Sequence, residues 1–403
     1  MNLETVPLRD LCEVRIGRTP SRSNQNFWGG PGVWLTISEL NGGELRDSKE
    51  HISELAIRDV MPPPVPAGTL LFSFKLSIGK MGVSAVPLYT NEAIAALPIR
   101  DPKRLDREYL RYALMATSGS VQANHAVLGA VLNKAKVEAL PIPVRPISEQ
   151  RRIVDLLSRA ENIVRMRREA EKKAKEIIPA LFLDMFGDPG TNPKGWDVKR
   201  VGDIASYTRY GPRFPDRKYA ETGAHILRTT DMDTSGNVRW EESPVLPVTQ
   251  EEVSRFSLRP GTVVVTRTGA TIGKIALFRG ADRPCIAGAY LIELGTTDDV
   301  DPEYLLALLL SDYGQSALTS GSRAVAQPNL NAPTIRAIPL PIPPKAFQSS
   351  FAKRVSSFQA LCRQQTGAIA VAEAAFQSLL AGIFSMDGRS DSRLSVHQPY
   401  STA

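Results

Sequence analysis

The sequence has few of the residues from which metal sites and disulfides are built. Of its 403 residues, three are cysteines and four are histidines. Cys12, Cys285 and Cys362 are too scattered for a CxxC site or a disulfide framework, and the histidines do not have the spacing of metal ligands. We therefore expect neither a metal site nor disulfides in this chain.

Long hydrophobic runs are also absent from the sequence. The longest apolar run, from Tyr304 to Leu310, is far shorter than the ~20 residues that a transmembrane helix needs. The first ten residues, MNLETVPLRD, contain two acidic side chains and no apolar core of a signal peptide. The sequence therefore predicts a cytoplasmic protein without a membrane partner.

The sequence motifs of nucleotide-dependent and hydrolytic enzymes are missing as well. The stretch from Gly269 to Ile275 approaches a phosphate-binding loop, but it is one residue too short and ends in isoleucine instead of a hydroxyl residue. There is no GxGxxG after a strand, no HExxH, no GxSxG and no Asn-Pro-Pro-aromatic motif of amino-methyltransferases. We therefore expect a chain that is not an enzyme and binds no cofactor itself.

What the sequence does contain is a moderate excess of basic residues. Lysine and arginine together number 49, against 42 aspartates and glutamates, which gives a formal net charge of +7. A positive charge of this size favours polyanionic partners without requiring them.

The sequence also contains an internal repeat with a period of about 195 residues. Ser77–Lys80 matches Thr271–Lys274, and Asn133–Pro143 matches Asn331–Pro341. Other matching segments follow one another in the same order, so two copies account for nearly the whole chain.

The composition changes within each copy at a cluster of prolines. Short β-prone runs broken by glycine, proline and asparagine come first and predict an α+β globule of about 140 residues. The segments after the cluster lose almost all glycine and proline and acquire helical periodicity. The predicted organisation is a globule at 1–147, a helix at 148–187, a second globule at 188–344, a second helix at 345–387 and a disordered tail at 388–403.

Apolar residues in the second helix follow steps of four and three, which is typical of a coiled coil. This seam begins at Phe351 and ends with Phe376, Leu379 and Ile383, and the matching positions of the first helix end with Leu181 and Met185. The two helices are therefore predicted partners. Since the ends of a compact domain are usually close, they should run antiparallel with a globule at each end, and Pro179 should kink the first helix.

Basic and hydroxyl residues recur in two loops of each globule. One is a Gly-Lys turn and the other is an earlier loop that contains arginines and aromatic residues. Such groups contact phosphates, and arginines such as Arg213, Arg228 and Arg267 can also bind guanine through two hydrogen bonds. An alternative is that the Gly-Lys turn is an ordinary solvated hairpin.

We expect DNA contacts from residues of both copies. In the first copy these are Arg15, Arg18, Arg22, Lys75, Ser77 and Lys80. In the second copy they are Arg209, Arg213, Lys218, Arg228, Arg267, Thr268, Thr271, Lys274, Arg323 and Gln327.

The arrangement as a whole resembles the DNA specificity subunit of type I restriction-modification systems. The resemblance rests on the duplicated globule, the Gly-Lys turn, the proline clusters LPIPVRP and IPLPIPP, and a long helix that ends in LFLDMFGD. It covers residues 1 to about 386. The second copy departs from the pattern after its proline cluster, with Ala346-Phe-Gln348 where the first copy has Ser148-Glu-Gln150.

The resemblance implies a non-catalytic subunit that reads a bipartite, asymmetric site in double-stranded DNA. Each globule is then a target recognition domain, and the helices form a spacer that sets the separation of the two half-sites. The implied partners are two DNA methyltransferase subunits and the restriction/translocase subunits, which would bind S-adenosylmethionine, ATP and Mg²⁺. The alternative from another class is a pseudo-symmetric coiled-coil adaptor that binds only proteins, and salt-dependent duplex binding separates the two.

Overall fold

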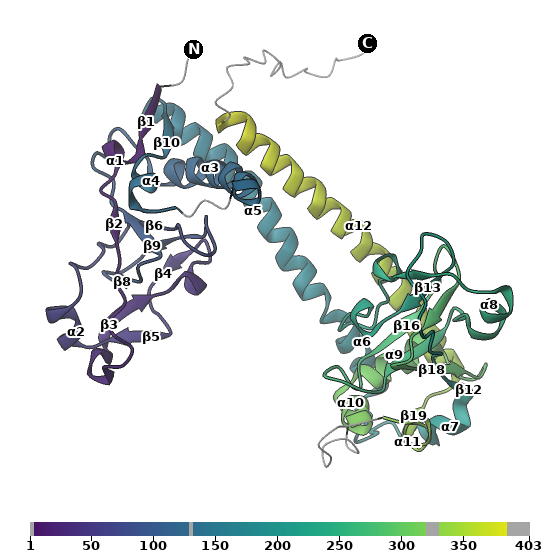
Figure 1. Cartoon of the computed structure of the whole chain (residues 1–403). Helices are drawn as coiled ribbons and strands as arrows, with labels where there is room; N and C mark the ends of the chain where they lie inside the picture. Colours follow the sequence, from purple (N-terminus) through teal and green to yellow (C-terminus); the bar gives the residue numbers. More distant parts are fainter. Residues whose placement is uncertain (1–3, 129–131, 320–329, 385–403) are drawn as a thin grey trace, which may run out of the picture. The chain divides into compact units, whose positions relative to one another are not determined.

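Two α+β globules and two long helices make up the chain (Figure 1). The computed structural model describes residues 4–128, 132–319 and 330–384, so the tail predicted at 388–403 lies outside the described residues. The chain divides into a first unit, Met1–Met166 with Ile369–Ala403, and a second unit, Arg167–Ala368. Each unit holds one globule and a part of each long helix, and the predicted fold class is confirmed.

The first globule contains sheets of five, three and two strands. Its strands are β1 (Glu4–Pro7), β2 (Arg15–Ile16), β3 (Trp28–Leu35), β4 (Glu44–Leu45), β5 (Glu50–Ile52), β6 (Leu70–Ser73), β7 (Met81–Ser84), β8 (Tyr89–Thr90), β9 (Ile94–Leu97) and β10 (Pro141–Val144). Their orders are β2-β9-β6-β7-β4, β5-β3-β8 and β1-β10. Its helical segments are α1 (Leu8–Leu11), η1 (Gln25–Phe27), η2 (Ile37–Glu39), α2 (Glu54–Asp59), α3 (Arg107–Leu128) and α4 (Lys134–Glu138).

The second globule repeats this plan with sheets of four, three and two strands. Its strands are β11 (Asp197–Arg200), β12 (Ala205–Tyr210), β13 (Ala224–Leu227), β14 (Val245–Leu246), β15 (Thr262–Thr266), β16 (Ile275–Phe278), β17 (Cys285–Ala287), β18 (Leu291–Thr296) and β19 (Pro339–Ile342). Their orders are β12-β18-β15-β16, β14-β13-β17 and β11-β19. Its helical segments are α7 (Val201–Ile204), η3 (Thr229–Asp231), η4 (Trp240–Glu242), α8 (Gln250–Phe256), α9 (Pro302–Leu310), α10 (Asp312–Thr319) and α11 (Ala332–Arg336).

The proline clusters form the two-stranded ribbons. In β10, prolines alternate with Ile142 and Val144, and β19 has the same alternation. Proline lacks an N–H group, and successive residues of a strand direct their N–H groups to opposite edges. Each of these strands can therefore donate hydrogen bonds along only one edge, which explains why it pairs with a single neighbour.

The segments after the proline clusters are helical, as predicted. The first contains α5 (Ile147–Ala174) and α6 (Ile177–Phe186), and the second is the continuous helix α12 (Lys345–Phe384). The predicted kink is confirmed as a break between α5 and α6. Pro179 is the third residue of α6, where an N–H group would have no partner within the helix.

Contacts within the second unit show that the helices run antiparallel. The hydroxyl of Thr366 on α12 donates to Glu171 on α5 at 3.3 Å. Later along the chain, the rings of Phe182 and Phe186 on α6 lie 5.8 and 5.5 Å from that of Phe351, which is earlier on α12. The predicted direction is therefore confirmed.

The predicted coiled-coil seam is wrong by one residue near the end of α12. Leu380 is buried there, whereas the predicted Leu379 is 37% exposed. The buried positions Phe376, Leu380 and Phe384 are four residues apart, which suits a straight helix packed on a globular core rather than a 3.5-residue coiled-coil repeat. In the first unit, the Phe384 ring lies 5.3 Å from that of Tyr109 on α3.

The same shift occurs near the end of α6 in the second unit. Phe182 and Phe186 are buried, whereas the predicted Leu181 and Met185 are only partly buried. The two phenylalanine rings lie 5.7 and 4.8 Å from the ring of Tyr304 on α9. Both helix ends therefore belong to the core of a globule.

A buried glutamine ties the start of α5 to the first globule. The Oε1 atom of Gln150 accepts a hydrogen bond from the backbone N–H of Asp106 at 2.8 Å. Its Nε2 atom donates to the carbonyl oxygens of Arg104 and Arg145 at 2.8 and 2.7 Å. The side chain is fully buried, so these bonds replace the water that the three backbone groups would otherwise bind.

Gln348 ties the start of α12 to the second globule in the same way. Its Oε1 atom accepts from the backbone N–H of Asp301 at 2.8 Å, and its Nε2 atom donates to the carbonyls of Asp299 and Pro343 at 3.2 and 2.7 Å. The copies are therefore equivalent at this residue, although the two residues before each glutamine differ.

Replacing Gln348 by alanine is expected to lower the free energy of unfolding by about 1–3 kcal/mol, because the three hydrogen bonds of a buried amide, to Asp299, Asp301 and Pro343, are lost. Gln364→Ala is the matched control, since Gln364 is an exposed glutamine of the same helix and should change stability by less than about 0.5 kcal/mol. Urea unfolding of both variants measures the difference. Equal stability of the two variants would show that the buried amide does not hold the helix.

Candidate nucleic-acid interface

Two loops of the second globule meet at one end of its four-stranded sheet. Tyr210, the last residue of β12, pairs with Ile292, and Thr266, the last residue of β15, pairs with Leu291. The loop at 211–218 and the turn at 267–274 therefore leave the sheet side by side. The Arg267 guanidinium lies over the Tyr210 ring at 4.7 Å and joins the two segments.

The first globule brings the corresponding loops together at the same place. Ile16, the last residue of β2, pairs with Ala95, and Ser73, the last residue of β6, pairs with Ile94. The loop that contains Arg18 and the turn at 74–80 therefore also begin at one end of a sheet.

A glycine lets the first of these loops pass close to a neighbouring strand. A Cβ atom on Gly17 would lie 2.0 Å from the carbonyl oxygen of Thr90, and a Cβ atom on Gly211 would lie 2.1 Å from that of Gly288. No other residue fits at either position without displacing backbone.

The Gly-Lys turns are closed hairpin turns in both copies. In the first copy, the Ser73 N–H donates to the Lys80 carbonyl at 2.8 Å, and the Ser73 carbonyl accepts from the Gly79 N–H at 3.0 Å. In the second copy, Thr266 forms the same two bonds with Lys274 and Gly273, at 2.8 and 3.0 Å. In the first copy the Ser73 hydroxyl also accepts from the Lys80 N–H at 2.9 Å. The N–H groups at the base of each turn are therefore already bonded, and the side chains of the turn are the groups we expect to contact a ligand.

Three predicted cations of the second globule already have internal partners. Arg209 donates to Glu293 from Nε and Nη2 at 2.9 and 2.5 Å. Arg228 donates to Asp231 from Nη2 at 2.7 Å, and Lys274 donates from Nζ to the carbonyl of Thr229 at 3.1 Å.

Burial determines how the acids of the two arginine pairs behave. Glu293 is fully buried, and burial raises its pKa although the hydrogen bond from Arg209 opposes the rise. Burial also acts to raise the pKa of Asp231, but hydrogen bonds from Arg228 and Ser243 leave it below the ordinary value. Arg209 therefore neutralises a charge inside the domain, whereas the Arg228 side chain remains 45% exposed.

Other predicted residues of the second globule are accessible. Arg213 and Lys218 are exposed and form no side-chain hydrogen bond or ion pair with any described residue. Thr271 is exposed, and Thr268 and Arg267 are half-buried. Arg323 and Gln327 lie outside the described residues.

The predicted residues of the first globule divide in the same way. Arg15 donates to Glu13 at 2.7 Å, and Arg18 donates from Nη1 to the carbonyl of Val60 at 3.2 Å. Lys75 is half-buried beside the Phe74 ring. The exposed members of the turn are Ser77 and Lys80.

Arg22 belongs to an ion pair that recurs in the other globule. It forms a two-pronged ion pair with Glu50, and its guanidinium lies 4.1 Å from the centre of the Trp28 ring. The hydrogen bond from Arg22 lowers the pKa of Glu50.

In the second globule, Arg217 pairs with Glu252 at 2.6 and 2.9 Å and lies 4.8 Å from the ring of Phe214. The hydrogen bond from Arg217 lowers the pKa of Glu252 to about 2. Sequence reasoning missed both acids, because each lies far along the chain from its arginine. The repeated ion pair indicates that Arg22 and Arg217 position the loop in their respective globules.

The described residues offer no chemistry of their own at this surface. Among them, no group of three histidine, cysteine or acidic side chains could hold a metal ion. Burial raises the pKa of the Cys12 and Cys285 thiols to about 12, so neither is a nucleophile near neutral pH. The arrangement can bind a polyanion through side chains displayed at one end of each sheet.

Comparison with known proteins identifies one family. The profile of the type I restriction modification DNA specificity domain matches residues 1–176 and 193–372. This is the family that the sequence resembles, and it is a family of DNA-recognition domains, which confirms the prediction that the chain is not an enzyme.

Two similar proteins come from Methanocaldococcus jannaschii. The chain is 27% identical over 244 residues to the type I restriction enzyme MjaIX specificity subunit, covering 54% of this chain and 55% of the relative. It is 26% identical over 285 residues to the MjaVIII specificity subunit, covering 64% of this chain and 65% of the relative. The matches thus span between about half and two thirds of the relatives' length.

Solved structures share the fold along nearly the whole chain. One of them has a TM-score of 0.62 and 18% identity, and the match covers 95% of this chain and 97% of the other chain. It is described as showing the structural basis of complex assembly and conformational transition of the type I R-M system. The S subunit from M. genitalium has a TM-score of 0.56 and 14% identity, covering 95% and 96%.

Proposed function

The chain belongs to the family of type I restriction modification DNA specificity domains, and from this we propose that it reads a bipartite, asymmetric site in double-stranded DNA, one half with each globule. The observation that supports this most strongly is the repeated loop pair. In both globules, an arginine-containing loop and the Gly-Lys turn leave the same end of a sheet. A side-chain surface of this kind suits the grooves and phosphates of a duplex.

The asymmetry of the site follows from the different residues that the two surfaces display. The turn of the first globule carries Lys75 and Lys80, whereas the second carries Arg267 against Tyr210, with Arg213 nearby in sequence. An ammonium group contacts phosphate as a point charge, whereas a guanidinium can bind guanine O6 and N7 through two hydrogen bonds. The two half-sites should therefore differ.

Catalysis belongs, in this proposal, to partner subunits. Two methyltransferase subunits would supply S-adenosylmethionine-dependent methylation, and restriction/translocase subunits would use ATP and Mg²⁺. The chain itself would bring them to the DNA, and the antiparallel helices would set the spacing between the half-sites.

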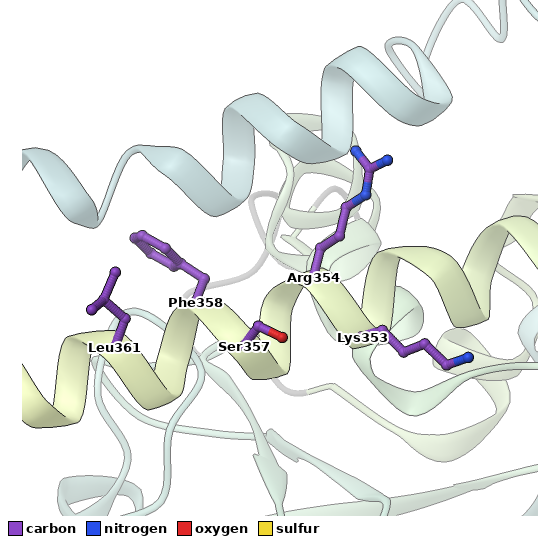
Figure 2. A pocket seen from close by; sticks show the side chains of 5 residues that line it. All are labelled: Lys353, Arg354, Ser357, Phe358 and Leu361. Carbon is purple, nitrogen blue, oxygen red and sulfur yellow. The ribbon is translucent and has the colours of Figure 1, made fainter.

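Exposed apolar side chains on the long helices support docking of such partners. Met166 on α5 is 65% exposed, and Val371 on α12 is 70% exposed. In the second unit, a hollow of about 470 Å³ on α12 is lined by Phe358 and Leu361 together with Lys353, Arg354 and Ser357 (Figure 2). Apolar surface of this kind marks interaction sites.

The composition of α12 would also satisfy a membrane-spanning helix, since one 18-residue window has a mean hydropathy of 1.6. Its ends argue against that role. Phe351 and Val355 lie in the core of the second globule, and Phe376 lies in the core of the first. We therefore propose protein partners, rather than lipid, for the exposed part of α12.

Arg213→Ala tests DNA reading most directly. In the methyltransferase complex, the substitution is expected to weaken binding to the cognate duplex by about 1–3 kcal/mol and to relax selectivity at one base pair, because a two-pronged guanine contact is lost. A salt titration on cognate and single-mismatch duplexes measures both effects. Lys218→Ala should instead weaken binding to all sequences alike and reduce the salt slope by about one.

Arg259→Ala is the matched control for these variants. Arg259 is an exposed arginine of the same globule, but it precedes β15 and so lies at the opposite end of that strand from the turn at 267–274. It should leave affinity and selectivity unchanged. If the complex binds all duplexes equally with and without this chain, the adaptor that binds only proteins is the better description.

A further inference from the structure

The tip of the turn at 74–80 displays a leucine to solvent. Leu76 is 95% exposed, the highest value among the large hydrophobic side chains of the described residues. It takes no part in the hydrogen bonds that close the turn, which run between Ser73, Ser77, Gly79 and Lys80. Packing and turn closure therefore give no reason for an apolar side chain here.

The backbone of Leu76 is also unfavourable for leucine. Its φ is +57°, in the left-handed region that disfavours any residue with a Cβ atom. The second turn, which Thr266 and Lys274 close, is one residue longer than the first, which Ser73 and Lys80 close. It has Gly269 at a positive φ of +91°. Glycine is the residue that adopts a positive φ most readily, so turn formation does not call for leucine, and the side chain is explained better by what it contacts outside the chain.

Two lysines flank this apolar tip in the turn. Lys75 precedes Leu76, and Lys80 is exposed at the base of the turn without a side-chain partner among the residues that the structure describes. The turn also lies at the sheet end that carries the loop with Arg18. A leucine between lysines suits a ligand that is anionic overall but offers an apolar group between its charges.

From these observations we propose that Leu76 contacts the 5-methyl group of a thymine in the half-site read by the first globule, an inference that rests on the proposed function. Double-stranded DNA places phosphates on both sides of the major groove, and the thymine methyl is the apolar group that its base pairs display there. A leucine side chain has no hydrogen-bond donor or acceptor, so it can distinguish base pairs only through such a contact. Leu76 is then a specificity-determining residue.

The test compares Leu76→Gly with wild type in the methyltransferase complex. The probes are the cognate duplex and two modified duplexes. In each modified duplex, deoxyuridine, which lacks the methyl group, replaces the thymines of a different half-site. Loss of one buried aliphatic contact predicts that wild type binds about five- to twentyfold more weakly when one of the half-sites carries deoxyuridine. Leu76→Gly should bind the unmodified duplex more weakly by a similar factor and show no further loss with deoxyuridine.

Stability separates this contact from a structural role. Leu76→Gly should unfold at the same or a higher temperature than wild type, since glycine accommodates a positive φ. Leu76→Asn should also fold, because asparagine tolerates this conformation, yet lose the response to deoxyuridine. Leu76→Met retains an apolar tip and should retain the response.

The inference would be overturned by a Leu76→Gly complex that binds as wild type does, or by a wild-type complex that is insensitive to deoxyuridine in both half-sites. A half-site of the first globule that contains only G·C pairs would also overturn it. Failure of the proposed function would look different, because the wild-type complex would then not distinguish cognate from unrelated DNA in the same titration.

Discussion

Replacing Arg209 by methionine is expected to lower the free energy of unfolding of the second unit by about 3–5 kcal/mol, because it leaves a buried carboxylate without its counter-charge. Glu293 is fully buried in β18, and Arg209 on the neighbouring β12 is the residue that donates to it from Nε and Nη2. Loss of DNA binding by this variant would therefore follow from unfolding, not from a lost base contact.

The pH dependence of this effect has a definite sign. Burial raises the pKa of Glu293 above its ordinary value, and removing Arg209 removes the interaction that opposes the rise. A group whose pKa is raised on folding contributes stability at low pH, and this contribution is lost as the pH rises through the folded pKa. The deficit of Arg209→Met should therefore be largest near neutral pH and shrink as the pH falls and Glu293 takes up a proton.

Urea unfolding at neutral and mildly acidic pH measures this prediction. Adding Glu293→Met to Arg209→Met should recover much of the stability, since no charge then remains buried. Arg217→Met is the control, because its pair with Glu252 is more accessible and should contribute little. An Arg209→Met variant as stable as the control at neutral pH would contradict the assigned role.

The repeat and the two helices could be predicted because they appear as periodic patterns in the sequence. The direction of the helices followed from connectivity, since the ends of a compact domain are usually close. The break before Pro179 followed from the chemistry of proline. The one-residue shift to Phe182 and Leu380 could not be predicted, because the seam was extended with a coiled-coil period into regions where each helix packs on a globule. Tertiary packing, not the helix's own pattern, sets which face is buried there.

The candidate site shows a different limit of sequence reasoning. The two loops could be identified in each copy. Whether a given lysine or arginine is bonded inside the domain or is accessible to DNA depends on a partner far along the chain. Lys80 and Lys274 occupy matching positions. Among the described residues, Lys274 donates to the carbonyl of Thr229, whereas Lys80 has no such side-chain partner. The lone glutamate in the apolar run of β18 was the available signal that Arg209 would turn inward.

Exchange of the first globule is expected to change one half of the DNA site completely and leave the other half unchanged. The exchange replaces residues 1–147 by those of another family member. The reading loops of each globule lie at its own sheet end. The contacts to the helices lie elsewhere, at the Tyr109 ring and at the backbone of Asp106, which Gln150 of the retained helix binds. A donor that keeps these contact residues should therefore retain stability and bring its own half-site.

Mapping methylated bases by single-molecule sequencing tests this most directly. Genomic DNA is compared from cells that carry the wild-type chain, the exchanged chain or no chain, each with the same methyltransferase. We predict a bipartite motif with two unlike halves and a fixed spacer for wild type, a motif altered in one half for the exchanged chain, and no motif without the chain. A motif that changes in both halves, in neither half, or persists without the chain would contradict the proposal that each globule reads its own half of the site.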